Sequence, residues 1–277
     1  MDKIPKELHL YWDESNMSML QTFTVSTFHK HNPDWKINVY IPKQKYVGTA
    51  QYIPVYNGKD YFPLVKKMDY VDVQTVDLDD YSINHNLHGI LRSDILRYHM
   101  LYNIGGVWSD FDIIWLKPME HFRNIEYNGD TPINEVDAIV SMVHETYGGH
   151  SIGVLIHSKG DPYVKSLIDL TKQVKPPHGH EVFGAAMLNK WYPTLESIPF
   201  PNVIGTRFET YYPYIIHLHN PTIQHLYNGN HLECLSNNNV MCVHWYNGHV
   251  FSKDYVNNDG FNRDCSMTTI LKNEECI

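Results

Sequence analysis

ILRSDILRYHMLYNIGGVWSDFDIIWLKP, residues 90–118, is the stretch from which the fold is predicted. Its first half has apolar residues at helical spacing and no proline, which predicts a helix. Gly105-Gly106 ends that helix, because glycine readily adopts the left-handed conformation found at helix ends. Residues 107–108 and 113–116 then read as buried strand on either side of Asp110-Phe111-Asp112.

Two pairs of charged residues fall within this frame. Asp94 and Arg97 are three residues apart, so they project from one face of the predicted helix. Asp110 and Asp112 are two residues apart on an extended chain and project to the same side. Two carboxylates that point together at the end of a buried strand repel each other, and burial raises that cost. We therefore expect a positive charge between them, and a hard divalent cation with open positions for phosphate oxygens fits well.

The Asp-x-Asp spacing is weak evidence when taken alone, since about one such tripeptide is expected by chance in a chain with this much aspartate. A second one, Asp77-Leu78-Asp79, follows a predicted strand at residues 71–76 and reads as a solvated strand end. Asp110-Phe111-Asp112 is distinguished by its setting. It follows a helix with Asp94 and Arg97, two glycines and an aromatic residue.

Composition and element order predict the fold class. The chain has 277 residues, of which 43% are hydrophobic and 13% aromatic, which suits one globular domain with a sizeable core. Residues 4–12 read as a strand, residues 18–30 as a helix and residues 36–41 as a second strand. This order opens an α/β nucleotide-binding layer.

Charge and apolar content exclude several classes of protein. The formal net charge of -9 argues against general nucleic-acid binding, and an anionic ligand would need local positive charge or a metal. No stretch has the apolar length of a membrane span, and residues 1–6 contain no signal-peptide core, so we expect a cytoplasmic protein without a transmembrane segment. The cysteines form no C-x-x-C pair, which favours scattered thiols over a zinc site; a disulfide-linked C-terminus is the alternative.

Residues 93–112, SDILRYHMLYNIGGVWSDFD, resemble the signature of the DXD-type sugar-transferase family. That pattern is S-D-x-x-R-Y, then L-Y, then G-G-x-aromatic-x-D-x-D, and the family includes initiating α-mannosyltransferases, α-1,4-galactosyltransferases and clostridial glucosylating toxins. Trp108 stands where tyrosine is more usual. The resemblance implies a GT-A-type nucleotide-sugar transferase fold, with a mixed, mostly parallel sheet flanked by helices.

The resemblance also divides the chain and assigns roles within the signature. A single domain, 1–277, would consist of a nucleotide-sugar-binding half (1–118), an acceptor-side half (119–250) and a polar tail (251–277). Asp94 and Arg97 would bind the hydroxyls of the donor sugar, Asp110 the ribose and sugar, and Asp112 the metal together with Asp110. From the residues alone, Asp94 and Arg97 also fit an ion pair on a helix surface, which is worth only tenths of a kcal/mol.

Further site residues are expected outside the signature. The resemblance places His9 and Trp12, at the end of the first strand, next to the nucleotide of the donor. A hydrogen-bonded imidazole in the core and simple core packing remain the alternatives for these two side chains. Glu181 could contact acceptor hydroxyls, or it could be a first-turn carboxylate favoured by a helix dipole.

Residues 240–245 read as a buried strand that ends in His244-Trp245. The resemblance implies that such a C-terminal element returns a metal or phosphate ligand, so we assign His244 to the metal and Trp245 to the donor. His217 and His219 are the rival ligands. A nitrogen ligand favours Mn²⁺ over Mg²⁺, although Mg²⁺ is retained as an alternative.

The resemblance implies a glycosyltransferase that moves a hexosyl or pentosyl group from a nucleotide sugar to a glycan hydroxyl. UDP is the preferred donor nucleotide, because uridine donors are commonest among relatives with this motif, and GDP-mannose is second. The family retains anomeric configuration, and no carboxylate here is an obvious covalent nucleophile, so same-face displacement with the departing phosphate as base is expected. The alternatives are a nucleotide-sugar hydrolase, a toxin-like enzyme that glycosylates protein, and a non-enzymatic carbohydrate-binding module.

Overall fold

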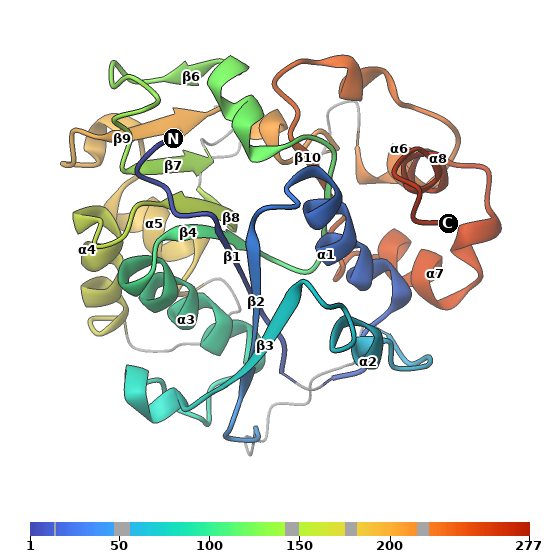
Figure 1. Cartoon of the computed structure of the whole chain (residues 1–277), viewed down its shortest axis with the longest axis horizontal. Coiled ribbons are helices and arrows are strands. Elements are labelled where there is room, and N and C mark those ends of the chain that lie inside the picture. The colour runs from blue at the N-terminus through green and yellow to red at the C-terminus, as the bar shows by residue number, and fades with distance from the viewer. Residues whose placement is uncertain (14, 47–55, 142–149, 175–181, 215–221) are drawn as a thin grey trace.

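The computed structural model describes residues 1–13, 15–46, 56–141, 150–174, 182–214 and 222–277 (Figure 1). Its strands are β1 (Glu7–Tyr11), β2 (Lys36–Pro42), β3 (Val71–Val76), β4 (Gly106–Ser109), β5 (Ile113–Trp115), β6 (Tyr127–Asn128), β7 (Ala138–Ser141), β8 (Ser151–His157), β9 (Val203–Thr206) and β10 (Cys242–His244). Its α-helices are α1 (Met19–His31), α2 (Phe62–Val65), α3 (Gly89–Asn103), α4 (Pro162–Thr171), α5 (Ala185–Trp191), α6 (Ile223–Tyr227), α7 (Val250–Asn257) and α8 (Ser266–Asn273).

The central sheet of the described residues has the strand order β3-β2-β1-β4-β8-β7-β9-β6, and β5 pairs with β10 in a separate two-stranded sheet. β3, β2, β1 and β4 are mutually parallel, as are β7 and β9. β8 runs antiparallel to both of its neighbours, and β6 runs antiparallel to β9. The expected α/β architecture with a mixed, mostly parallel sheet is therefore confirmed.

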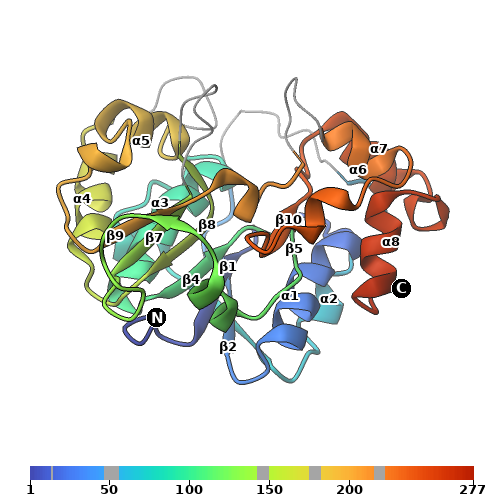
Figure 2. The ribbon, with the colours of Figure 1, turned by 90° about the horizontal axis from the view of Figure 1, so that it is seen from above.

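Helices cover both faces of this sheet (Figures 1 and 2). α1 and α2 lie on one side, and α3, α4 and α5 lie on the other. Leu8 and Leu10 of β1 belong to the core that also contains Phe28 of α1, whereas Tyr11 belongs to the core that contains Leu96 of α3. Successive side chains of a strand point to opposite faces, which is why one short strand serves two cores.

The ends of α1 and α3 follow from local chemistry. Ser18 caps α1 in a capping box with Gln21, and the His88 side chain caps α3 by accepting the Ile90 N–H. α3 ends where the sequence predicted, because Gly105 and Gly106 follow it with φ of +79° and +106°. The turn carries the chain from α3 into β4, and β4 ends one residue before Asp110.

We expect Gly106→Ala to destabilise the protein by about 3 kcal/mol, because two costs combine at this position. A Cβ on Gly106 would meet the backbone oxygen of Glu7 at 2.3 Å, and the residue also has positive φ. Gly160→Ala is the matched control, since Gly160 has φ of +75° with nothing within 4 Å of its would-be Cβ. It should cost only about 1 kcal/mol. Urea denaturation measures both, and equal costs would contradict the role of the β1 contact.

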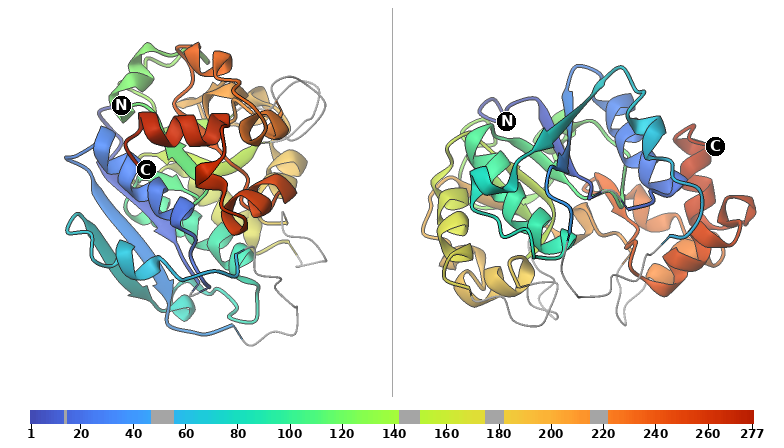
Figure 3. Two further views of the ribbon diagram at one scale, coloured as in Figure 1. Left: turned by 90° about the vertical axis from the view of Figure 1, so that its right-hand side faces the viewer. Right: turned by 90° about the horizontal axis from the view of Figure 1, so that it is seen from below.

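Residues 251–277 are helical and packed rather than the expected polar tail. α8 lies against α1 (Figure 3), where the Glu274 carboxylate pairs with His31 at 2.9 Å and Lys30 at 3.4 Å. Met267 and Leu271 of α8 are fully buried in a core that includes Leu20 and Phe23 of α1. The overall polarity of the segment hid the apolar face of a short amphipathic helix, which is why composition alone misled.

Two expectations about the whole chain can be compared with the described residues. None of the described helices is both long enough and apolar enough to cross a membrane. Cys234, Cys242, Cys265 and Cys276 are all free thiols, as the spacing of the cysteines favoured.

Candidate active site

A cavity of about 300 Å³ opens where β1 and β4 end and α3 begins. Open α/β sheets bind ligands at the carboxyl ends of their parallel strands, and this cavity lies there. Its walls come from four segments far apart in the sequence: the end of β1, the first two turns of α3, the residues after β4 and the turn after β10. Its lining residues include Trp12, Arg97, Asp110, Asp112 and Asn247.

Asp110 and Asp112 line the same cavity, as their spacing predicted. Asp110 Oδ1 accepts a hydrogen bond from Trp108 Nε1 at 3.1 Å and lies 3.4 Å from Arg97 Nη2. Asp112 Oδ2 accepts the Asn247 backbone N–H at 2.9 Å, and its Oδ1 lies 3.2 Å from His244 Nε2. Each carboxylate therefore has its own positive or donor partners, so the two do not compete for one group.

These different partners drive the pKa values of the two carboxyls apart. Burial raises the pKa of Asp110 above its usual range, although the charge of Arg97 acts in the opposite direction. Burial acts the same way on Asp112, but His244 and the Asn247 N–H outweigh it, so the pKa of Asp112 is lowered. Asp112 is thus the carboxylate that stays ionised most readily, which is what a cation ligand requires.

Asp94 and Arg97 form a buried ion pair with 2.6 Å between Oδ1 and Nη2, and only 3% of the Arg97 side chain and 4% of the Asp94 side chain are exposed. The alternative of a helix-surface salt bridge is therefore wrong. The Arg97 guanidinium joins three groups, because it also donates to the Ile152 carbonyl and faces Asp110. It stacks over the Trp108 ring at 5.1 Å. Arg97 lines the cavity, and Asp94 lies behind it.

Two of the three residues assigned to the donor from outside the signature do not line the cavity. His9 is fully buried, and its Nδ1 and Nε2 contact the Tyr40 hydroxyl at 2.9 Å and the Gly105 carbonyl at 2.8 Å. This is the hydrogen-bonded core imidazole that the sequence had left as the alternative. Trp245 is also fully buried and packs in the core beneath α7 and α8. The structure gives neither side chain a path to a donor in the described cavity.

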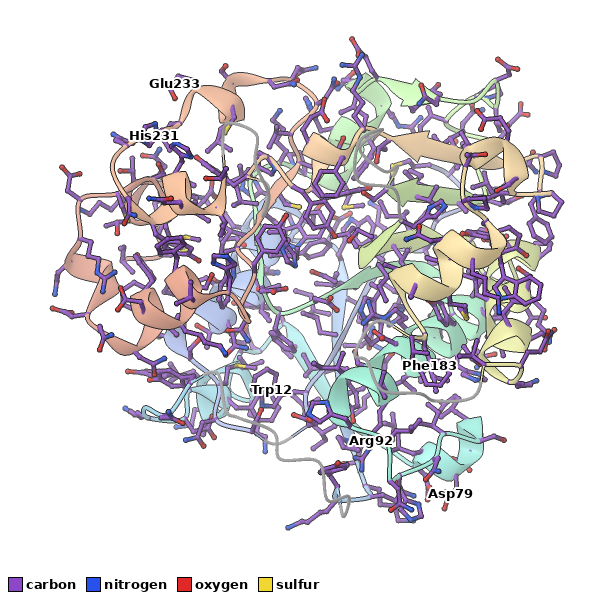
Figure 4. All side chains as sticks on the ribbon, turned by 180° about the vertical axis from the view of Figure 1, so that it is seen from behind. Trp12, Asp79, Arg92, Phe183, His231 and Glu233 are labelled. Carbon is purple, nitrogen blue, oxygen red and sulfur yellow. The ribbon has the colours of Figure 1, made fainter. Side chains whose placement is uncertain are left out.

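Trp12 does line the cavity, and core packing fixes its orientation. Its indole N–H donates to the Ser15 carbonyl at 2.9 Å, and its ring meets Phe111 edge-on with 5.3 Å between centroids. Figure 4 places Trp12 towards the middle of the molecule. The packing interpretation of Trp12 is therefore confirmed, and its contact with a nucleotide stays a prediction. Glu181, His217 and His219 lie outside the described residues.

Asn247 is a cavity residue that sequence reasoning missed. Tyr246, just before it, has φ of +52°, so the chain turns sharply after β10 and brings the Asn247 N–H onto Asp112. The side-chain oxygen of Asn247 is buried and accepts no hydrogen bond. A buried oxygen without a donor is costly, and a ligand or cation would relieve that cost. The Asn-Gly pair at residues 247–248 was the available signal, since it marks a tight turn.

The residues around Asp112 fit a divalent cation that would take some of its ligands from the protein and the others from a bound anion. No group of three His, Cys, Asp or Glu side chains forms a complete metal site within the described parts of the chain. Asp112 and Asn247 nevertheless line the cavity, and the Asn247 amide oxygen is buried without a hydrogen-bond partner. His244 is not a lining residue, but its Nε2 lies 3.2 Å from Asp112 Oδ1, so a carboxylate, an imidazole and an amide oxygen are available near Asp112. Oxygen and imidazole ligands together suit Mn²⁺. A partly filled set of this kind leaves positions for phosphate oxygens.

Residues 18–129 match the model of the family described as glycosyltransferase sugar-binding region containing DXD motif. The matched range contains Asp94, Arg97, Asp110 and Asp112. The match to that family is confined to this region of the chain. Both Asp-x-Asp tripeptides of the chain lie within the matched range, and Asp110-Phe111-Asp112 is the one that lines the cavity.

Similarity to individual proteins covers more of the chain than residues 18–129. The initiation-specific alpha-1,6-mannosyltransferase of Saccharomyces cerevisiae is 29% identical over an alignment that covers 61% of this chain. The alignment covers 40% of the yeast protein, so the chain spans well under half the length of this relative. Among solved structures, the PaToxG glycosyltransferase is 17% identical, with 70% of this chain and 72% of that chain covered and a TM-score of 0.45. The galactosyltransferase LgtC, in complex with donor and acceptor sugar analogs, is 12% identical, with 98% and 94% covered and a TM-score of 0.45.

Proposed function

We propose that this protein is a metal-dependent glycosyltransferase that moves a sugar from a nucleotide-sugar donor to a hydroxyl of a glycan. The observation that carries the proposal is the placement of Asp110 and Asp112 in one cavity with the buried Arg97 guanidinium. The family of residues 18–129 supports the same reaction class. A carbohydrate-binding module would have no need of this pair of carboxylates beside a cation.

Each side chain has a proposed task in that reaction. Asp112 and His244, with the amide oxygen of Asn247, would hold a divalent cation, and bound there it would supply positive charge to the departing diphosphate. Asp110 accepts hydrogen bonds from hydroxyls of the ribose and sugar. Arg97, fixed by Asp94, donates to sugar hydroxyls through its planar fork.

The donor and acceptor are proposed by chemical class. A UDP-sugar is the first candidate because of the resemblance of the signature. GDP-mannose is the second, and the name of the yeast relative, a mannosyltransferase, favours it. The division into a donor half at 1–118 and an acceptor half at 119–250 is part of the same proposal. We propose retention of anomeric configuration, with the departing phosphate acting as base.

We expect the full chain to release nucleoside diphosphate when it is incubated with Mn²⁺ and its matching donor from a panel of UDP-sugars and GDP-mannose. EDTA should abolish the release and added Mn²⁺ should restore it, because the carboxylate pair needs the cation to hold a diphosphate. A glycan acceptor should increase the release if the protein is a transferase, whereas the rate of release by a hydrolase would not depend on the acceptor. Release that persists undiminished in EDTA would contradict the metal-dependent mechanism.

A further inference from the structure

The first residues of β8 form an irregular segment beside the cavity. β7 and β8 pair as Ile139 with Ile156 and as Ser141 with Ser151, so two steps along β7 correspond to five steps along β8. We call residues 151–153 the β8 bulge. Bulges of this kind turn backbone groups out of the regular ladder and are frequent next to active sites. Here the Ile152 carbonyl bonds a side chain, while the Gly153 carbonyl continues the pairing of β8 with β4, in which Val154 lies opposite Ser109.

Those carbonyls hold two residues of the proposed active site. The Ile152 carbonyl accepts a hydrogen bond from Arg97 Nη1, and the Gly153 carbonyl accepts the Asp110 backbone N–H at 2.8 Å. Arg97 lies on α3 and Asp110 follows β4, so the β8 bulge joins two elements that each carry one side chain of the site. A shift of the bulge would therefore move both Asp110 and Arg97.

Tyr212 is the side chain that fixes the bulge from behind. Its hydroxyl makes a short hydrogen bond with the Ser151 hydroxyl, which also accepts the Gly153 N–H at 3.4 Å. Only 2% of Tyr212 is exposed. Its ring stacks on Phe208 with 4.5 Å between centroids and packs against His244 at 5.0 Å. Rings on two sides prevent the phenol from moving away from Ser151.

The space around Gly153 shows how tightly these groups are fitted. A Cβ on Gly153 would lie 2.9 Å from the Tyr212 hydroxyl, 3.4 Å from Asp110 Oδ2 and 3.6 Å from His244 Cδ2. The hydroxyl of Tyr212 thus approaches the same point as the carboxylate and the imidazole. Glycine is needed at position 153 because it leaves this space to the Tyr212 hydroxyl.

We propose that Tyr212 is a positioning residue of the active site, which acts through Ser151 on the β8 bulge and through the bulge on Asp110 and Arg97. The effect on catalysis rests on the proposed function. Tyr212 itself lies outside both the DXD motif and the range that matches the family. Tyr212 touches neither donor nor acceptor in this account. Its contribution is to hold the acidic residue at the end of β4 in register with the arginine of α3.

Tyr212→Phe tests the proposal, because it keeps the ring and removes the hydrogen bond to Ser151. We expect nucleoside diphosphate release to fall about 3- to 10-fold. The indole N–H of Trp108, which donates to Asp110 Oδ1, gives a readout that needs no donor. Its NMR signal, assigned with Trp108→Phe, should shift and its hydrogen exchange should speed up.

Tyr255→Phe is the matched control. Tyr255 is equally buried, and its hydroxyl also bonds a hydroxyl, Thr268 Oγ1, at 2.9 Å, but it lies on α7 in another core. It should lower stability by a similar amount and leave both the Trp108 signal and the rate unchanged. If Tyr212→Phe also leaves the Trp108 signal unchanged, the positioning role is refuted, whatever reaction the protein catalyses. If the signal moves while no donor is turned over, the proposed function fails and the structural link stands.

A pair of further variants tests the same link by rescue. Gly153→Ala should impair the rate and displace the Trp108 signal more than Tyr212→Phe does, because its methyl group meets the Tyr212 hydroxyl. The double variant Gly153→Ala/Tyr212→Phe removes that hydroxyl and should therefore recover to the rate and the Trp108 signal of Tyr212→Phe. A double variant as impaired as Gly153→Ala, or more so, would show that the hydroxyl is not what the glycine accommodates, and would overturn the proposal.

Discussion

Replacing Asp112 with asparagine lowers the turnover of sugar transfer by about 1,000-fold while the protein stays folded. The carboxylate of Asp112 bonds His244 Nε2 and the Asn247 N–H, and its pKa is held below the usual range. An asparagine side chain has nearly the same shape and still accepts one of these bonds. It carries no charge, however, so it would hold a divalent cation much more weakly than the carboxylate would.

The second Asp-x-Asp tripeptide provides the control for this variant. Asp79→Asn makes the same chemical change at an exposed residue, and Figure 4 places Asp79 at the edge of the molecule, far from Trp12. Turnover of Asp79→Asn should equal that of the wild type. Steady-state rates of diphosphate release, with circular dichroism as a check of folding, measure both. If Asp112→Asn kept a rate close to that of the wild type after divalent metal had been removed, the metal-dependent mechanism would be refuted.

Arg97→Met should lower the free energy of unfolding by about 3 to 5 kcal/mol and also suppress transfer. The guanidinium lies 2.6 Å from Asp94 and 3.4 Å from Asp110, and 3% of its side chain is exposed. Its removal leaves the buried Asp94 carboxylate and the partly exposed Asp110 carboxylate without their positive partner. Arg97→Lys restores the charge without the planar fork, so it should recover part of the stability and little of the activity. Urea denaturation in EDTA gives the stabilities, and diphosphate release gives the rates.

Arg92→Met is the control that separates the effect of Arg97 on stability from its effect on sugar transfer. Arg92 is also buried, with 1% exposed, but it donates to the carbonyls of Leu87, Gln44 and His85. Arg92→Met should therefore destabilise the protein and yet retain turnover per folded molecule within a few-fold. Equal loss of turnover in Arg92→Met and Arg97→Met would show that Arg97 acts only on stability.

The parts of the fold that local chemistry determines were predictable. α3 ends before Gly105-Gly106 and Ser18 caps α1, since both depend on residues a few positions apart. Asp110 and Asp112 line one cavity as expected, although they lie in the turn between β4 and β5 and not on an extended segment. Their common placement in a cavity also followed from the general position of ligands in open α/β sheets. These features account for the acidic pair and for the donor side of the site.

The residues that sequence reasoning misplaced depend on contacts between distant segments. His9 is a core residue because Tyr40 and Gly105, 31 and 96 positions away, satisfy both of its nitrogens. Trp245 is buried because α7 and α8 cover it, and those helices were not expected. Arg97 is buried against the Ile152 carbonyl, 55 positions away. Periodicity within one segment carries no information about such partners.

The most direct test of the central claim is a crystal structure of the full chain with Mn²⁺ and UDP, or GDP if the donor panel selects it, with data collected at the manganese absorption edge. We expect an anomalous peak that marks a manganese ion bound to Asp112, with the diphosphate on the side of the ion that faces the cavity and the nucleoside in the cavity lined by Trp12. A nucleotide bound elsewhere, beside an Asp110–Asp112 pair that carries no manganese, would contradict it.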